Sequence, residues 1–483
     1  MARNPSTRWY SALAVLLIFV LLAWLLGAVL TLTGGEKVAL QVGLVTLGLI
    51  AAGALLWYLR PRDEPVADPT DKRDADVSSL VAAARARLPR GVFDAKPLVL
   101  VLGPEGSCKS TAVLRSGTDP ELLSGDAPAG TDMPRKTALA NLWLVKDAVL
   151  AEAGGPVFAD AALWQRMVRA LRPPRLAAAL GRAQAAPRAA VVCVSCDLFT
   201  GPNAHTQIEA LAKLTRERLT EAAKAWGVAI PVYVFFTKAD RLPHFETWAS
   251  PLTREEVRAP VGAALPFDAA AGDGGKRAQS TGTYAERMVP RIESAFARIV
   301  AELAGHRRDL LGRESQPDKR LTAYELPREV GKISAQATRF LVEICRPVHV
   351  GVSPQLRGFY VVGARPVMIT DAPAPVANKA AAQPSTSSSA TNVFTPQQIM
   401  AAEAAASPKG STTRRVPQWV FLERLFPDVV LADSGAVAMA RGGVRVATVR
   451  RALLGVGIAA SLFVTIAVLR SWMGNRTLAS KVA

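Results

Sequence analysis

Nine residues at 103–111, GPEGSCKST, have the composition of a loop that binds phosphate. They follow the apolar run PLVLVL at 97–102 and precede a helical pattern, which is the order of strand, loop and helix that such a loop requires. Glycines let backbone N–H groups close around phosphates, Lys109 would reach the outer phosphates, and the hydroxyl of Ser110 would bind magnesium. The pattern indicates either a site for GTP or ATP with Mg²⁺, or a fold of this kind whose site has decayed and holds none.

One residue of the loop departs from the usual pattern. The position directly before the lysine is normally glycine, and here it is Cys108. A Cβ atom and a thiol crowd a backbone that must approach phosphate closely, and they add strain if that backbone is left-handed. The sequence therefore predicts a nucleotide site that is impaired rather than abolished.

Two further segments stand where a nucleotide-binding domain would need them. TKAD at 237–240 follows an apolar strand, and in GTPases the Asp of such an element accepts hydrogen bonds from guanine while the Lys packs on the base. DAVLAEAGG at 147–155 offers Glu152 at a turn where an Asp usually completes the magnesium shell. Glu is longer by one methylene, so hydrolysis is less supported than binding, and no catalytic residue is assigned. The predicted cofactor-binding residues are Gly103, Gly106, Ser107, Cys108, Lys109, Ser110, Thr111, Lys238 and Asp240, with Ser110 also the magnesium ligand.

Three runs without a charged residue, at 9–35, 38–59 and 452–469, are each long enough to cross a bilayer. The first two read as a membrane hairpin, and arginines at its outer ends place both ends in the cytoplasm. The chain has 58 Lys and Arg against 40 Asp and Glu, a net charge of +18, which juxtamembrane arginines beside anionic lipids explain without nucleic acid. Half of the residues are hydrophobic and four are cysteines, which excludes a disordered chain and a disulfide scaffold.

The runs at 97–102, 141–145, 189–194 and 231–236 are typical of fully buried parallel strands. Helical patterns between and after them predict an α/β P-loop NTPase-like cytoplasmic domain with a helical extension, plus three transmembrane helices. The predicted organisation is a cytoplasmic tail (1–8), a transmembrane hairpin (9–59), a tether with a short helix (60–96), the P-loop NTPase-like domain (97–265), a helical extension with a terminal strand (266–370), a flexible linker (371–413), a membrane-proximal segment (414–451), a third transmembrane helix (452–469) and a short periplasmic tail (470–483).

The chain resembles the TssM/IcmF family, an inner-membrane component of type VI secretion systems. GPEGSCKS at 103–110 is similar to the family loop G-P-x-G-[AS]-G-K-[ST], and DAVLAEAGGPV at 147–157 to its DEAVLIDTAGRY segment. IPVYVFFTKAD at 230–240 and LRGFYVVGA at 356–364 resemble its IPVYVLLTKCD and LRGVYFTSA. FLERLFPDVVLAD at 421–433 is similar to its FLxxLFxxVIFPEAxLA. The resemblance covers about residues 9–475.

The resemblance implies a multi-pass protein of the bacterial inner membrane whose bulk lies in the cytoplasm. It implies contacts with a small inner-membrane secretion partner, with baseplate components and with further copies of the chain. Family members continue into a large periplasmic region that meets an outer-membrane lipoprotein, whereas this chain ends about fourteen residues after the third run. A naturally short or split version, or one whose periplasmic part was removed, would look the same, which leaves the lipoprotein contact open.

Two functions therefore remain in competition. In the first, the protein is a structural scaffold of a type VI secretion membrane complex, anchoring the baseplate and tail through a cytoplasmic domain with a degenerate nucleotide site. In the second, it is a membrane-tethered GTPase or ATPase that switches or drives assembly of the secretion complex. The first predicts that function survives Lys109→Ala, and the second predicts that it does not.

Overall fold

The computed structural model separates the chain into two compact units, residues 1–72 with 448–483 and residues 73–447. It describes residues 72–126, 137–173, 184–266, 283–347, 352–370 and 413–433, apart from 147 and 185, together with residue 178 and scattered positions at 15–51 and 435–472. The predicted linker up to residue 412, and most of the predicted spans at 9–59 and 452–469, lie outside the described residues.

In the first unit, two helical segments at 18–26 and 41–49 are described. They approach closely at Gly48, where an added Cβ would lie 2.6 Å from the Cβ of Phe19. Both segments expose large apolar side chains, among them Trp24 and Leu47. Within the described residues, no helix is both long enough and apolar enough to cross a membrane. The three predicted spans thus remain predictions.

The second unit is built on one mixed sheet. Its strands, in the described residues, follow the order β2-β3-β4-β1-β5-β6-β8-β7. Their bounds are β1 Leu98–Leu102, β2 Glu121–Ser124, β3 Ala140–Val145, β4 Ala148–Ala153, β5 Ala189–Ser195, β6 Pro231–Thr237, β7 Val261–Ala264 and β8 Gln355–Val361. Neighbours from β4 through β1, β5 and β6 to β8 are parallel. β2, β3 and β7 join the sheet as antiparallel strands.

The predicted parallel strands are confirmed for β1, β5 and β6. The prediction is wrong for β3, which runs antiparallel to β4. Only Lys146 and Asp147 separate these two strands, and a parallel crossover needs a dozen residues or more. The segment DAVLAEAGG, predicted to form a turn, is largely strand β4, and Glu152 lies within that strand.

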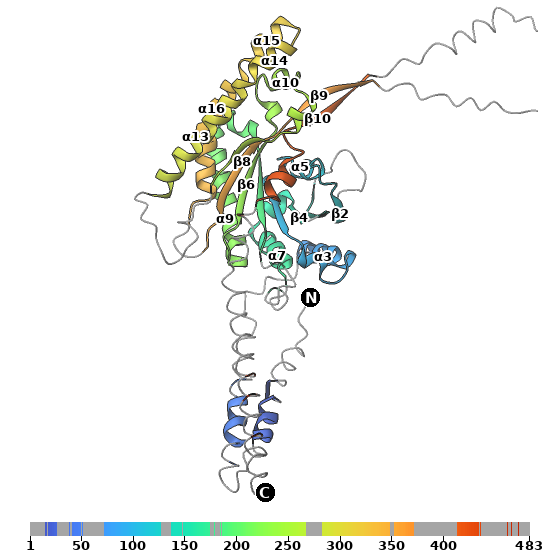
Figure 1. Cartoon of the computed structure of the whole chain (residues 1–483), viewed down its shortest axis with the longest axis vertical. Helices are drawn as coiled ribbons and strands as arrows, with labels where there is room; N and C mark the ends of the chain where they lie inside the picture. Colours follow the sequence, from blue (N-terminus) through green and yellow to red (C-terminus); the bar gives the residue numbers. More distant parts are fainter. Residues whose placement is uncertain are drawn as a thin grey trace, which may run out of the picture. The chain divides into compact units, whose positions relative to one another are not determined.

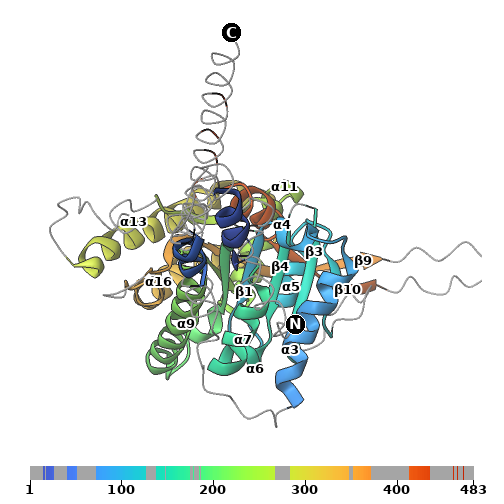
Figure 2. The ribbon, with the colours of Figure 1, turned by 90° about the horizontal axis from the view of Figure 1, so that it is seen from below.

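Both faces of the sheet are buried, which explains its continuous apolar strands. Leu98, Leu100 and Leu102 of β1 belong to one core, and Val99 and Val101 to the other. The first core is covered by α3 (Lys72–Arg87), α4 (Val92–Ala95), α6 (Gly155–Ala159), α7 (Ala161–Leu171), α9 (Ala204–Trp226), α13 (Tyr284–Gly305) and α16 (Leu326–Ile344). The second is covered by α5 (Lys109–Leu114) and η3 (Leu425–Val430). Figure 2 shows α9 and α7 beside the strand β1.

Two long helices, α13 and α16, form the helical extension (Figure 1). A capping box at Thr283 and Glu286 begins α13, and Pro327 stands in the first turn of α16. These two helices confirm the helical patterns predicted to follow the strands. Short helices complete this part of the chain, namely α10 (Phe245–Ala249), α11 (Arg254–Arg258), α14 (Arg307–Arg313) and α15 (Pro317–Ala323). β8 follows α16 and places the extension directly against the central sheet.

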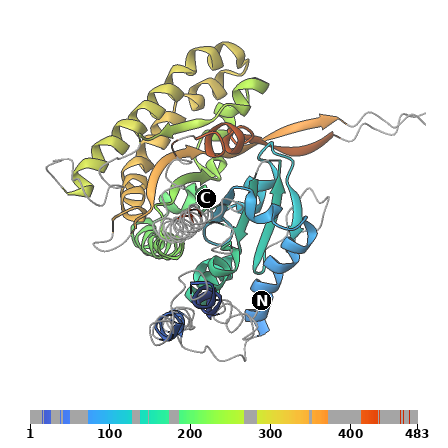
Figure 3. The same cartoon turned by 60° about the horizontal axis from the view of Figure 1, so that its bottom comes forward.

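A two-stranded hairpin of β9 (Gly363–Thr370) and β10 (Thr413–Val420) projects from the sheet (Figures 1 and 3). After β10 the chain returns to the second core, where Phe426 is fully buried and its ring meets that of Phe235 edge-on at 5.5 Å. Just beyond η3, Asp433 pairs with Arg357 of β8 at 2.8 Å. Residues 421–433 are therefore fastened to the sheet by both packing and charge.

Candidate functional site

The predicted phosphate loop lies where the sequence placed it, between β1 and α5 at the carboxyl end of a central strand. Three of its residues have positive φ, Gly103 (150°), Gly106 (75°) and Cys108 (59°). The glycines adopt these angles without strain. An added Cβ at Gly103 would lie 2.3 Å from the carbonyl oxygen of Cys193, so the loop crosses β5 in close backbone contact.

Cys108 is the strained residue of this loop. Its φ of 59° and ψ of 28° place it in the left-handed region, directly before the first residue of α5. For a residue with a Cβ this conformation costs about 1–2 kcal/mol, which glycine would avoid. Burial raises the pKa of the Cys108 thiol, so the side chain stays protonated at neutral pH. The left-handed backbone of Cys108 is thus the geometric reason why a residue with a Cβ is unfavourable at this position of the loop.

The amine of Lys109 is turned into its own loop. Its Nζ donates to the carbonyl oxygens of Gly103 at 2.9 Å and Pro104 at 2.7 Å, and the residue is only 6% exposed. Burial lowers the pKa of Lys109. In this conformation the lysine stabilises the closed loop, and it would have to exchange these carbonyls for phosphate oxygens to serve a nucleotide.

Ser110, the predicted magnesium ligand, is bound by a carboxylate. Its hydroxyl donates to Glu152 Oε1, and Glu152 is completely buried in β4, paired with Val101 of β1. The same oxygen accepts from Thr137 Oγ1 at 3.2 Å. The other oxygen, Oε2, accepts from Asn141 Nδ2 at 3.3 Å and Trp143 Nε1 at 3.1 Å. Glu152 therefore connects the phosphate loop to the strand β3 and the residues before it.

Thr137, Asn141 and Trp143 are members of the site that sequence reasoning missed. They come together with Glu152 only because β3 folds back on β4, with Asn141 directly opposite Glu152. The available signal was Asn141, a polar residue at the start of the otherwise apolar run NLWLV. A polar side chain that is fully buried needs partners, and here they are Thr137 and Glu152.

The TKAD segment reaches the same edge of the sheet. Thr237 at the end of β6 donates to the carbonyl oxygens of Ser107 at 3.0 Å and Val194 at 3.3 Å, which fixes the loop against β5 and β6. Lys238 has a φ of 55°, and exposed Asp240 accepts a hydrogen bond from the backbone amide of Ala364 at 3.1 Å. The structure thus brings the TKAD segment and the phosphate loop together. One oxygen of Asp240 already accepts a hydrogen bond from Ala364 near the start of β9.

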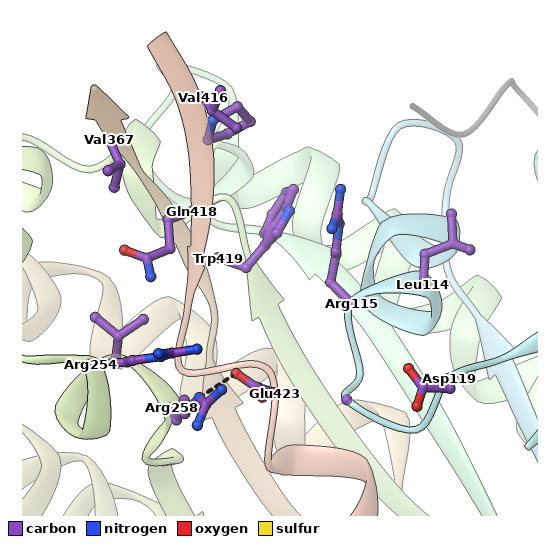
Figure 4. Close-up of a pocket in the computed structure, with 13 residues that line it drawn as sticks. Leu114, Arg115, Asp119, Arg254, Arg258, Val367, Val416, Gln418, Trp419 and Glu423 are labelled. Carbon is purple, nitrogen blue, oxygen red and sulfur yellow. Dashed lines mark hydrogen bonds and ion pairs between the residues drawn. The ribbon is translucent and has the colours of Figure 1, made fainter. Parts of the chain in front are cut away.

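A pocket of about 450 Å³ lies at the opposite end of α5 (Figure 4). Arg115, Arg254 and Trp419 line it, and Arg258 Nε donates to Glu423 Oε2 at 2.8 Å across its base. Because the phosphate loop is at the N-terminal end of α5 and this pocket is at the C-terminal end, the two are separate features.

The phosphate loop and the residues around Glu152 suit the phosphates of a magnesium nucleotide but not its magnesium ion. The loop amides, the N-terminus of α5 and Lys109 form a cradle suited to phosphate. The magnesium part does not fit, because the four lone-pair positions of the Glu152 carboxylate face four donors, from Ser110, Thr137, Asn141 and Trp143. Glu152 therefore offers a cation no vacant carboxylate oxygen.

A comparison with protein families shows which family the chain belongs to. Residues 159–460 match the IcmF-related N-terminal domain. The chain belongs to this family. The matched range contains the segments at 230–240, 356–364 and 421–433 and begins after the phosphate loop. The resemblance to TssM/IcmF proteins inferred from the sequence motifs is confirmed.

A curated relative of this IcmF-related chain is the type VI secretion system component TssM1 of Pseudomonas aeruginosa. The two are 26% identical over 271 residues, which is 55% of this chain and 23% of the relative, so the chain spans about a quarter of that protein's length. A solved structure that aligns is the small COPII coat GTPase SAR1 from Encephalitozoon cuniculi in complex with GDP, at 16% identity over 40% of this chain and 62% of that one. Its TM-score of 0.17 is too low to establish a common fold.

Proposed function

We propose that this IcmF-related chain is a structural component of a type VI secretion membrane complex, with a degenerate nucleotide site. Support for the pathway comes from the family match and from the name of the relative TssM1. The observation that carries the scaffold role is the closed phosphate loop, in which Lys109 binds its own loop carbonyls and Ser110 binds Glu152. Such a loop holds its shape without nucleotide.

The proposed location is the bacterial inner membrane, with the 73–447 unit in the cytoplasm. The charge-free runs at 9–35, 38–59 and 452–469 support it, as do exposed apolar residues such as Trp24 in the described helical segments. Segment 421–433, fastened to the sheet, lies ahead of the third run at 452–469, so it would connect the cytoplasmic domain to the membrane. A small inner-membrane partner, baseplate components and further copies of the chain are the partners proposed for this domain.

The degenerate site predicts weak nucleotide binding that a single substitution improves. We expect Cys108→Gly to tighten binding of GTP or ATP, because glycine removes the Cβ and thiol that crowd the approach of phosphate to the loop. The left-handed strain, about 1–2 kcal/mol, is already present in the free loop and does not change the affinity. Lys109→Ala should remove nucleotide binding, since Lys109 is the only positively charged residue in the loop at 103–111. Calorimetric titration of the full-length chain in detergent, with both variants in parallel, measures these effects.

The outcomes of this titration separate the two functions. Weak binding by the unsubstituted chain, with no turnover in any variant, supports the degenerate site. Micromolar or tighter binding together with hydrolysis would favour a membrane-tethered GTPase or ATPase. Absence of binding by all three proteins at millimolar nucleotide would leave a pure scaffold, and the residues assigned to nucleotide would lose that assignment.

A further inference from the structure

The donors and acceptors around Glu152 can be assigned, and the hydrogen bonds all lead toward its carboxylate. The backbone N–H of Asp126 donates to Asn141 Oδ1 at 3.0 Å, which fixes the orientation of that amide. Asn141 Nδ2 must then face the other way, where it donates to Thr137 Oγ1 at 3.0 Å. Because the Thr137 oxygen is accepting there, its own proton is available for Glu152. Each group in the chain of contacts thus directs a donor toward the buried carboxylate.

The same contacts tie the residues directly before β3 to the phosphate loop and to Asp126. Asp126 accepts from the backbone amide of Ala138 through Oδ2 at 3.0 Å. Thr137 lies 3.3 Å from Ser110 Oγ and donates to Glu152. The phosphate loop, Thr137 and the β3–β4 pair therefore meet at one carboxylate.

We propose that Glu152 takes the place of a divalent cation, linking the phosphate loop to Thr137 and strand β3 by direct hydrogen bonds. A cation that bridged the Ser110 hydroxyl and a carboxylate would keep its ligand oxygens about 2.9 Å or more apart, given Mg–O distances near 2.1 Å. Here the Ser110 hydroxyl contacts Glu152 directly, and the extra methylene of Glu relative to Asp provides the reach. The link therefore needs neither nucleotide nor metal.

This inference deepens the proposed degenerate site and rests on it, but the two fail in different experiments. The full-length chain is unfolded by heat in 5 mM Mg²⁺ and in EDTA, and amide hydrogen exchange is followed at residues 137–141. Three variants accompany it. Glu152→Gln keeps the size but places an NH₂ group against donors, Glu152→Asp shortens the reach, and Glu217→Gln on the exposed face of α9 is the matched control.

We expect the unsubstituted chain to unfold at the same temperature, within about 1 °C, in Mg²⁺ and in EDTA. Glu152→Gln should lower that temperature by about 5 °C in both conditions, because buried donors lose their acceptor, and Glu217→Gln should leave it unchanged. Exchange at 137–141 should rise in Glu152→Gln and stay constant in strands β5 and β6. Glu152→Asp, with room for an ion, should recover part of its lost stability in Mg²⁺ when GTP is present.

A rise of several degrees on adding Mg²⁺ to the unsubstituted chain would overturn the proposal, because it would show that the site takes the cation. A Glu152→Gln variant with unchanged stability and amide exchange would overturn it as well, since the hydrogen bonds to Glu152 would then contribute nothing to stability. Loss of secretion with Lys109→Ala would instead refute the scaffold function and leave this link untouched.

Discussion

Replacing Arg357 with alanine is expected to destabilise the 73–447 unit by about 3–5 kcal/mol, the usual cost of leaving a buried charge without its partner. Arg357 Nη2 lies 2.8 Å from Asp433 Oδ2, and the two side chains are only 13% and 14% exposed. The guanidinium also donates to the carbonyl oxygen of Leu265 at 2.9 Å, and Tyr233 donates its hydroxyl to the same carboxylate. After the substitution Asp433 would lose the guanidinium that neutralises its carboxylate.

Urea unfolding of Arg357→Ala against Arg328→Ala measures this effect. Arg328 pairs with Glu325 on the surface of α16, where the arginine is 73% exposed, and such pairs contribute about 0–1 kcal/mol. Equal losses in the two variants would contradict the assignment. In the proposed scaffold, this pair would hold the chain to the sheet ahead of the predicted third span.

The second large effect is expected at Gly103. An alanine Cβ there would lie 2.3 Å from the carbonyl oxygen of Cys193 and 2.9 Å from Ser107 Oγ, closer than such atoms approach. The φ of 150° is also one that residues with a Cβ rarely adopt. The loop or β5 would have to shift, and we expect Gly103→Ala to cost about 3 kcal/mol of stability and to remove any nucleotide binding.

Gly106 provides the matched control on the same loop. Its φ is 75°, but an added Cβ would meet nothing within 4 Å. Gly106→Ala should therefore cost only the left-handed strain, about 1–2 kcal/mol. Urea unfolding of both variants checks the difference. If Gly106→Ala were the more destabilising change, the close contact between the loop and β5 could not be the reason that position 103 requires glycine.

Much of the fold could be predicted from sequence because its elements have strong local patterns. The apolar runs that became β1, β5 and β6 are continuous, and the long helices α9, α13 and α16 have regular apolar spacing. The direction of β3 could not be predicted in this way, because a strand buried on both faces has the same composition whether it runs parallel or antiparallel. Strand β4, AVLAEA, was missed because alanine and glutamate have low strand propensity.

The candidate site likewise contains residues that could be predicted from sequence and residues that could not. Gly103, Lys109 and Ser110 were found because a phosphate loop is a contiguous motif with a fixed spacing. The partners of Glu152 were not, since Thr137, Asn141 and Trp143 reach it only after β3 and β4 pair. Sequence also suggested that Glu152 is a poor replacement for Asp in a metal site. The structure adds what it does there, which is to accept four hydrogen bonds.

The central claim is that this domain acts as a scaffold whose nucleotide site is not needed. The most direct measurement is type VI secretion by cells in which Lys109→Ala replaces the unsubstituted chain, with membrane abundance of the protein checked in parallel. We predict secretion equal to that of the unsubstituted chain, because the closed loop is held together by Glu152, Ser110 and Thr237 as well as by Lys109. Loss of secretion by a variant that is present in the membrane at normal abundance would contradict the account and would indicate a working nucleotide switch.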